Sequence, residues 1–374
     1  MPSIRIAIAG VGNCASSLLQ GIEWYRQDPS RNVGLCHPDL GGYRVTDILP
    51  VAAFDIDARK IGRPLEDAIF ADPNNTRQIV RPLPATGVLV QMGPILDGIA
   101  PHMQEYPPHQ RFVPADVRPV DIARTLRESR ADLLVNYLPV GSQKASEAYA
   151  QACLDAGVAL VNCIPVFIAS DPAWAARFKS ASLPCVGDDI KAQVGATITH
   201  RTLARLFQER GVRIDATYQL NTGGNTDFLN MLNRTRLGSK KISKTEAVQS
   251  QLDEPLDPDQ IHIGPSDFIP FLKDQKVCFL RLEGSGFAAQ PLNLELRLAV
   301  EDSPNSAGVA VDAIRCCKLA LDARLSGPIE SVSAWTMKHP PVQMPDADAL
   351  GAMREFVAEA QKRSTTVLNS EICT

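Results

Sequence analysis

The sequence predicts an α/β fold built on a doubly wound parallel sheet, and two observations predict it. Apolar strand patterns alternate with helical patterns through residues 1–186, and the first strand pattern runs directly into a glycine-rich turn. Alternating strands and helices are typical of parallel sheets with helices on both faces. Because 374 residues are too many for one typical core, we expect two domains.

The glycine-rich turn has the pattern of a dinucleotide-binding site. An apolar strand over residues 3–9 precedes Gly10-Val11-Gly12-Asn13-Cys14-Ala15, a G-x-G-x-x-A sequence that opens a helix through about Tyr25. Gly10 permits the tight turn, Gly12 lets the backbone approach a pyrophosphate, and Ala15 lets the helix pack close to the sheet. Because a strand and a helix flank it, the turn predicts a Rossmann-type domain.

A carboxylate ends the next strand pattern, which covers residues 51–54. Asp55 is placed to bind the ribose hydroxyls of NAD. The usual spacing between the glycine-rich turn and this carboxylate is about 20 residues. It is longer here because residues 27–47 intervene, and we interpret them as an inserted loop. Two alternatives stay open: Asp57 is the ribose ligand, or Asp55 caps the following turn.

Further alternation continues the sheet as far as residue 186. Ser142 and Pro165 follow strand patterns, where ligands of such sheets bind, so they line the nicotinamide side or are ordinary turn residues. The expected strands are 131–138, 158–163 and 184–186, and the expected helices are 121–128, 143–154 and 171–179.

An acidic segment, Gly187-Asp188-Asp189-Ile190-Lys191-Ala192-Gln193-Val194-Gly195, follows the last of these strands. A helix pattern over 196–207 comes next, and the amides of a helix N-terminus bind anions. Two carboxylates and an ammonium beside such a terminus suit acid–base chemistry on a phosphorylated substrate. The alternative is an acid-rich, N-capped helix start.

The pattern changes from residue 212 onward. A strand over 212–220 leads into a polar loop over 221–227, which approaches a ligand or is simply a turn. Lys240 and Lys244 share one helix face, an arrangement that commonly marks a solvated surface. Alternating patterns over 276–282 and 292–300 predict an antiparallel pair that suits an oligomer interface.

The C-terminal part begins with a helix start. Asp302 or Ser303 is the expected N-cap and Pro304 an early helical residue, ahead of a long apolar helix over 309–321. Residues 331–337 are strand-like and end in Lys338, and the chain past Asp346 reads as a helix.

Composition excludes several classes of function. The net charge is −4, no basic stripe suggests nucleic acid, and no apolar run approaches a bilayer span. Nine scattered cysteines without a CxxC pair, and the lack of a signal-peptide pattern, predict a cytoplasmic protein with reduced thiols.

Taken together, these motifs resemble myo-inositol-1-phosphate synthase (inositol-3-phosphate synthase) in its shorter prokaryotic form, over nearly the whole chain. The resemblance implies a Rossmann domain over 1–193 and 303–374, and an inserted α+β domain over 194–302 that carries catalysis and tetramer contacts. The matching segments are 10–17, 70–76, 187–191, 221–227, 239–244 and 302–306.

The resemblance also implies an activity: a cytoplasmic homotetramer that converts D-glucose 6-phosphate to 1L-myo-inositol 1-phosphate with bound NAD. C5 is oxidised, C6 loses a proton, the resulting enolate attacks the C1 aldehyde, and the ketone is reduced again, so net redox is zero. The alternatives are an NAD-dependent dehydrogenase or cyclase acting on a different sugar phosphate, and a non-catalytic NAD-binding protein.

The resemblance also implies roles for individual residues that match the family's motifs. Lys240 is implied in C5 proton transfer, and Lys276 and Lys338 in stabilising the oxyanions. Asp189 and Asp302 are the implied active-site acids that orient the lysines. The implied substrate residues are Lys191, Ala192, Gln193, Asn221, Gly224, Asp227 and Lys244, and the implied cofactor residues are Gly10, Gly12, Asn13, Cys14, Ala15, Asp55, Asn75, Ser142, Pro165 and Asp188.

One position departs from the family pattern. The family commonly has a serine where this chain has Ala192, in the segment that holds the substrate phosphate. Losing a hydroxyl that donates to a charged acceptor costs about 1.5–3 kcal/mol of binding free energy. A different sugar phosphate as the substrate therefore stays an alternative. A monovalent or divalent cation near the cofactor phosphate also stays open, since Asp188, Asp189 and Asp302 are hard oxygen ligands.

Overall fold

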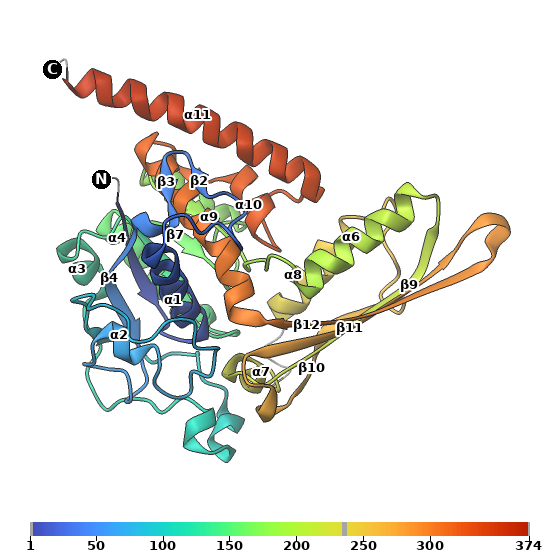
Figure 1. The fold of residues 1–374 in the computed structure, drawn as a ribbon, viewed down its shortest axis with the longest axis horizontal. Helices are drawn as coiled ribbons and strands as arrows, with labels where there is room; N and C mark the ends of the chain where they lie inside the picture. The colour runs from blue at the N-terminus through green and yellow to red at the C-terminus, as the bar shows by residue number, and fades with distance from the viewer. Residues whose placement is uncertain (1–2, 234–237, 373–374) are drawn as a thin grey trace.

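The computed structural model describes residues 3–233 and 238–372, apart from the side chains of 239–241, 266 and 365–372. Figure 1 shows a half built around a parallel sheet and a second half made of long strands, with α9 (Asp302–Asp322) leading from β12 (Pro291–Glu301) in the second half back into the first. Among the described residues no helix is both long and apolar enough to cross a membrane.

The first sheet has seven strands in the order β13-β8-β7-β6-β1-β4-β5, and all of its pairs are parallel. This confirms the predicted α/β class. The strand order reverses at β1, which lies between β4 and β6, and ligands of such sheets bind at this point of reversal. The strands are β1 (Ile4–Ala9), β4 (Ile48–Asp55), β5 (Val90–Met92), β6 (Leu133–Asn136), β7 (Ala159–Asn162), β8 (Pro184–Val186) and β13 (Gly327–Pro328).

Helices bury both faces of this sheet, because side chains alternate along each strand. Ile6 and Ile8 of β1 belong to a core shared with α1 and α9, whereas Ala7 and Ala9 belong to a core shared with the helices of the other face. With α9, the helices α1 (Asn13–Gln27) and α2 (Leu65–Ala68) contribute to the first core, and α3 (Ile122–Glu128), α4 (Gln143–Ala156) and α5 (Pro172–Ser180) contribute to the second.

The expected loop over 27–47 contains a small hairpin, β2 (Asp39–Leu40) and β3 (Tyr43–Arg44). The guanidinium of Arg315 on α9 holds this segment, since it donates to the carbonyls of His37, Pro38 and Tyr43. The insertion is therefore an ordered part of the fold.

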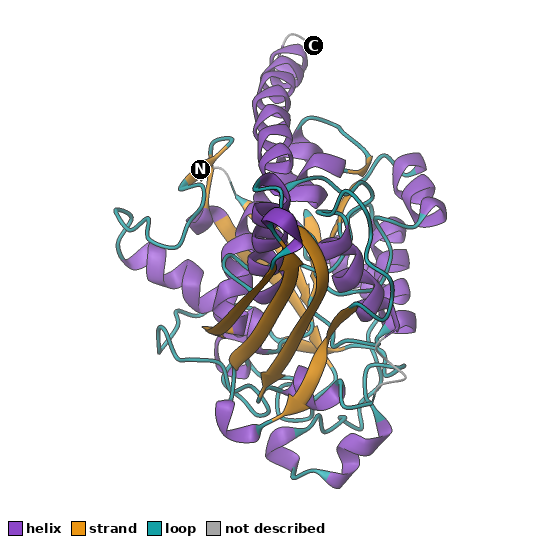
Figure 2. Ribbon diagram, turned by 90° about the vertical axis from the view of Figure 1, so that its right-hand side faces the viewer, coloured by secondary structure: helices purple, strands orange, loops and turns teal. Residues whose placement is uncertain are grey.

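The second sheet has the order β10-β9-β11-β12 and is mixed: β9 and β10 are parallel, and the other pairs are antiparallel. Figure 2 shows its strands side by side at the front of the molecule. The expected antiparallel pair is confirmed as β11 and β12. The elements are α6 (Ala196–Glu209), β9 (Arg213–Gly223), α7 (Thr226–Asn230), α8 (Gly238–Gln249), β10 (Ile261–Phe268), β11 (Gln275–Ser285) and β12 (Pro291–Glu301).

Three local predictions were wrong. Residues 331–337 form not a strand but α10 (Glu330–Thr336), whose buried Val332 and Thr336 are enclosed by α9 and α11 (Asp346–Ile372). Strand β9 continues through Gly223, because β10 and β11 both pair with residues of the expected polar loop. The N-cap of α9 is Glu301, so Asp302 is already helical.

A backbone pairing joins the C-terminal segment to the acidic segment. The amide of Lys191 donates to the carbonyl of Thr336 over 2.8 Å, and the amide of Lys338 donates to the carbonyl of Asp189 over 2.7 Å. Residues 188 and 339 exchange a further pair of bonds, each 3.0 Å long. The pairing brings predicted site residues from both segments together.

Candidate functional site

A single large cavity gathers most of the predicted site residues. It lies beyond the carboxyl ends of β1 and β6 and is closed on the other side by residues of the second half. Among the described residues, its lining includes five lysines and four aspartates, namely Lys60, Lys191, Lys244, Lys276, Lys338, Asp55, Asp189, Asp227 and Asp302.

The start of α1 forms one wall of the cavity. Gly10 has φ +93°, and a Cβ there would lie 2.6 Å from the carbonyl oxygen of Tyr137, so this turn requires glycine. At Gly12 a Cβ would meet nothing within 4 Å. No side chain caps the helix, so its first amides face the cavity without an intrahelical partner. Such a terminus suits a pyrophosphate.

Asp55 holds the glycine-rich turn as well as lining the cavity. Its Oδ2 accepts from the amide of Val11 over 2.8 Å, and its Oδ1 accepts from the amides of Ile56 and Asp57. The proposed turn-capping role is therefore present. The guanidinium of Arg59 donates to both carboxylate oxygens of Asp57, the alternative ribose ligand, and Asp57 does not line the cavity.

Lys60 was missed in the sequence analysis. Its side chain is 1% exposed, and its Nζ donates to the carbonyl of Val11 over 2.8 Å and to Oδ1 of Asn74 over 2.9 Å. The ammonium lies 3.7 Å from Oδ2 of Asp55. The ammonium of Lys60 thus holds the glycine-rich turn in place. Its position in the sequence, after the strand that ends at Asp55, carried no signal that predicted this role.

The paired backbone segments bring Asp189 and Lys338 together at the cavity wall. The Nζ of Lys338 donates to Oδ1 of Asp189 over 2.7 Å and to the carbonyl of Ile190 over 2.5 Å. The Oδ2 of Asp189 accepts from the hydroxyl of Ser243 on α8 over 2.7 Å. Three distant parts of the chain therefore fix one ion pair.

Lys276 enters the cavity from β11. Its Nζ donates to Oδ1 of Asp302, at the first turn of α9, over 3.1 Å. Burial disfavours the charged form, but the carboxylate of Asp302 outweighs it and raises the pKa of Lys276 above the usual lysine value. This lysine is therefore a permanent cation at neutral pH.

The N-terminus of α6 forms a second wall. Its N-cap is Gly195, no side-chain oxygen caps it, and residues 195–198 line the cavity. This contradicts the alternative of a side-chain-capped, acid-rich helix start. Ala192 lines the cavity beside this terminus: a Cβ on Gly195 would lie 2.8 Å from its methyl group. An anion here would meet free helix amides and nearby ammonium groups.

Asp274, also missed, ties the two halves together beside the cavity. It is 1% exposed, and its Oδ1 accepts from Nδ2 of Asn13, from Nδ2 of Asn225 and from the hydroxyl of Ser303. Burial raises the pKa of this carboxyl to about 6. Its position two residues before Lys276 was the one available signal.

The remaining predicted residues take different places. Most of the predicted residues line the cavity, namely Gly10, Gly12, Asn13, Cys14, Asp55, Ser142, Pro165, Asp189, Lys191, Ala192, Asp227, Lys244, Lys276, Asp302 and Lys338. The side chain of Lys240 lies outside the described residues, although its backbone belongs to α8. The structure does not place Ala15, Asn75, Asp188, Gln193, Asn221 or Gly224 in the cavity lining.

Each of those six has a contact that explains its place. Ala15 is buried in the core, as expected for close packing of α1. Asn75 donates to the carbonyl of Gly224, and Nδ2 of Asn221 donates to the carbonyl of Gly264. Gln193 turns away, since its side chain donates to the carbonyl of Gly34.

Asp188 is enclosed by protein donors. The side chain of Asn162 and the amides of residues 168–170 all donate to its carboxylate. Burial raises its pKa. We therefore assign this carboxylate to the structure of the acidic segment and not to direct contact with a ligand in the cavity.

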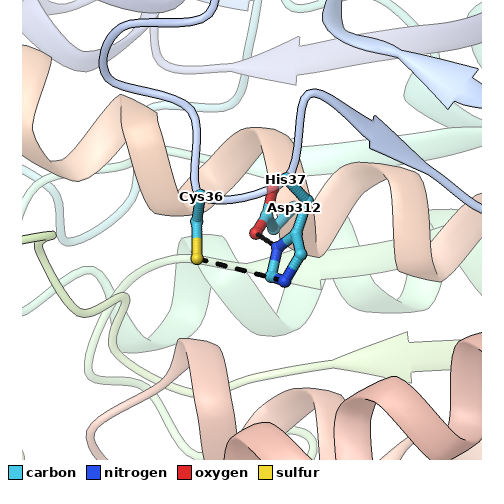
Figure 3. A group of neighbouring side chains, drawn as sticks. All are labelled: Cys36, His37 and Asp312. Carbon is cyan, nitrogen blue, oxygen red and sulfur yellow. Dashed lines mark hydrogen bonds and ion pairs between the residues drawn. The ribbon is translucent and has the colours of Figure 1, made fainter.

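A cluster with metal-ligand chemistry lies elsewhere (Figure 3). Nδ1 of His37 is 2.7 Å from Oδ2 of Asp312, and Sγ of Cys36 is 4.0 Å from Nε2 of the same histidine. The guanidinium of Arg315 donates to the other oxygen of Asp312 and neutralises it. These contacts pin the hairpin segment to α9, and none of the three lines the cavity.

Comparisons with known proteins agree with this architecture. The family model for myo-inositol-1-phosphate synthase matches residues 195–303. Inositol-3-phosphate synthase of Mycobacterium tuberculosis is 54% identical, with 95% of each chain covered, and that of Corynebacterium glutamicum is 54% identical over 96% of this chain and 99% of its own. A myo-inositol-1-phosphate synthase-related protein of Thermotoga maritima has the same fold, with a TM-score of 0.78, 23% identity and coverage of 95% and 98%. The chain belongs to the myo-inositol-1-phosphate synthase family.

Proposed function

We propose that this chain converts D-glucose 6-phosphate to 1L-myo-inositol 1-phosphate, using bound NAD without net redox change. The observation that carries the proposal is one cavity lined by two uncapped helix N-termini, those of α1 and α6, and by several lysines. Two such termini suit two phosphate-bearing ligands, a dinucleotide and a sugar phosphate.

The α1 side of the cavity fits NAD. Open space beside Gly12 admits a pyrophosphate, Asp55 ends the second strand of the sheet, and Ser142 and Pro165 line the opposite edge. When bound, NAD supplies a hydride acceptor that later returns the hydride.

The lysines supply the fixed positive charge that this chemistry needs. Negative charge develops on the C5 oxygen during enolisation and on the C1 oxygen during ring closure, and fixed cations aimed at these oxygens lower both barriers. We assign this work to Lys276 and Lys338, held by Asp302 and Asp189 respectively. Lys240 stays our candidate for the C5 proton.

The α6 terminus is our proposed phosphate site, with Lys191 and Lys244 beside it. Ala192 offers no hydroxyl there, which keeps a different sugar phosphate as the alternative substrate. Asp189 and Asp302 also stay candidates to share a cation with the cofactor phosphate, since both line the cavity.

We also propose the domain division 1–193 plus 303–374 and 194–302, and a cytoplasmic homotetramer. The second sheet supports an assembly role, because its face away from α6 carries Phe279, 44% exposed and paired with Leu220 and Arg297. A tetramer that persists at nanomolar concentration in sedimentation velocity supports this assignment, and a monomer opposes it.

The activity test incubates purified protein with glucose 6-phosphate and NAD. Inositol phosphate formed without accumulating NADH is the expected result. Stoichiometric NADH release indicates the dehydrogenase alternative, and no reaction with any hexose phosphate indicates a non-catalytic protein.

A further inference from the structure

A buried ion network lies behind the part of the cavity wall formed by Lys191. The side chain of Lys191 is 2% exposed, and its Nζ donates to the carbonyl of Ala334 over 2.7 Å and to Oδ1 of Asp346 over 3.0 Å. Asp346 is the first residue of α11, and its Oδ2 accepts from Nε of Arg201 over 2.9 Å. One carboxylate thus bridges two buried cations.

Arg201 fixes that carboxylate in place. It lies on α6 and is fully buried, and its guanidinium donates to the carbonyl of Ala247 on α8 over 2.7 Å and to that of Met344 over 2.8 Å. Its position is therefore set by three parts of the fold. Through Asp346, this rigid anchor sets the position of the Lys191 ammonium.

The charge of Lys191 also depends on Asp346. Burial lowers the pKa of Lys191 to about 8, and the charges facing it are Asp346 from α11, Arg201 from α6 and Lys338 from the segment after α10. Although burial opposes the ionised form, Lys191 and Arg201 hold the pKa of Asp346 below its usual value. Without this carboxylate the remaining charges named above are the cations Arg201 and Lys338, so the Lys191 ammonium would lose its proton more readily.

We propose that Asp346 is a positioning residue for phosphate binding, which keeps the Lys191 ammonium charged and aimed at the cavity beside the α6 terminus. Two of the three N–H donors of this ammonium serve Ala334 and Asp346, and the third serves an anion in the cavity. The C-terminal helix thereby takes part in the site, although none of its described residues lines the cavity. This inference rests on the proposed function.

The test compares Asp346→Asn with Asp348→Asn. Asp348 is exposed and lies in the same first turn of α11, so its replacement removes the same charge from the helix N-terminus without touching Lys191. Calorimetry measures the affinity of the full chain for inorganic phosphate and for glucose 6-phosphate between pH 6.5 and 9 (a range of about one to two units around the pKa of a buried lysine). Thermal unfolding checks that each variant folds.

Wild type and Asp348→Asn should lose affinity as the pH rises through about 8. In Asp346→Asn the loss should begin at lower pH, with affinity about tenfold weaker at neutral pH, the usual cost of a charge-assisted hydrogen bond. Asp346→Glu should restore most of it. The same pH profile for Asp346→Asn and Asp348→Asn overturns the inference.

Two further outcomes separate this inference from the proposed function. A chain that binds phosphate in the expected way but not glucose 6-phosphate contradicts the proposed function and leaves Asp346 its role, whereas a chain that binds neither overturns both. If Asp346→Asn does not fold, Lys191→Met is used instead. The alkaline loss of affinity must then disappear, and its persistence overturns the inference.

Discussion

Lys338 and Asp189 are 149 positions apart in the sequence, yet their charged groups lie 2.7 Å apart at the cavity wall. Their backbones pair as well, through the amide of Lys338 and the carbonyl of Asp189. The cation therefore has little freedom to move, because both its backbone and its ammonium are tied to one residue. Such a preorganised charge stabilises a developing oxyanion without rearranging during the reaction.

Replacing this cation should remove activity without unfolding the protein. We expect Lys338→Met to lower kcat about 100- to 1000-fold, the usual loss on removing one oxyanion-stabilising group. Lys318→Met is the matched control: Lys318 is also ion-paired and is 16% exposed against 15% for Lys338, but it lies on α9 away from the cavity. Equal loss in both variants would contradict the assignment.

The pH dependence of activity should report the pair of Lys276 and Asp302. The carboxylate raises the pKa of Lys276, so Asp302→Asn should lower that pKa. If the charged lysine is required, the alkaline limb of the kcat profile then moves to lower pH; this profile is taken at saturating substrate, so that the weaker substrate binding expected as Lys191 titrates does not enter. Glu301→Gln, one residue earlier, serves as the control, and an unmoved alkaline limb in Asp302→Asn would count against a catalytic cation at Lys276.

His200 should make the fold sensitive to acid. It lies on α6 and is fully buried against β9, where its Nε2 lies 2.8 Å from the hydroxyl of Thr217, and burial lowers its pKa to about 4. Because the unfolded chain binds this proton more tightly, stability is full above about pH 6.5 and falls as the pH drops toward 4, by about 3 kcal/mol.

Urea unfolding of wild type and His200→Gln at a series of pH values measures this loss. The stability difference between the two proteins should shrink as the pH falls from 7 to 4. The exposed His109, replaced in the same way, should leave the pH dependence unchanged. A constant difference for His200→Gln shows that this histidine is not held neutral.

Asp274 should change the stability of the fold with pH in the direction opposite to His200. Its pKa is raised to about 6, so the folded protein holds this proton more tightly than the unfolded chain does. Its contribution to stability is therefore present below about pH 4 and is lost as the pH rises through 6, by about 3 kcal/mol. The wild type should lose stability relative to Asp274→Asn over this range, and the exposed Asp267→Asn should show no such trend.

The first sheet could be predicted because its signals are local. Residues 3–15 contain the strand, the turn and the helix start together, and the turn itself favours glycine at position 10, where φ is +93°. By contrast, the serine- and threonine-containing α10 resembles a strand in sequence, and only its enclosure by α9 and α11 makes it a helix. Tertiary packing overrides local propensity here.

The candidate site, too, could be predicted from local motifs only in part. The lysines and aspartates of the matching motifs were identified, and most of them line the cavity. The partners that set their charge were harder to find, since Asp346 and Lys191 are 155 positions apart and meet only through the fold. Asn221 and Gln193 do not line the cavity, because their side chains turn to the carbonyls of Gly264 and Gly34, and sequence cannot say toward which side of the backbone a side chain turns.

The most direct measurement of the central claim follows a deuterium atom placed at C5 of glucose 6-phosphate. If the lysines and the bound dinucleotide close the ring within one cavity, the hydride taken from C5 returns to the same carbon, and the inositol phosphate retains the label. Deuterium found in free NADH, or lost from the product, would contradict the account.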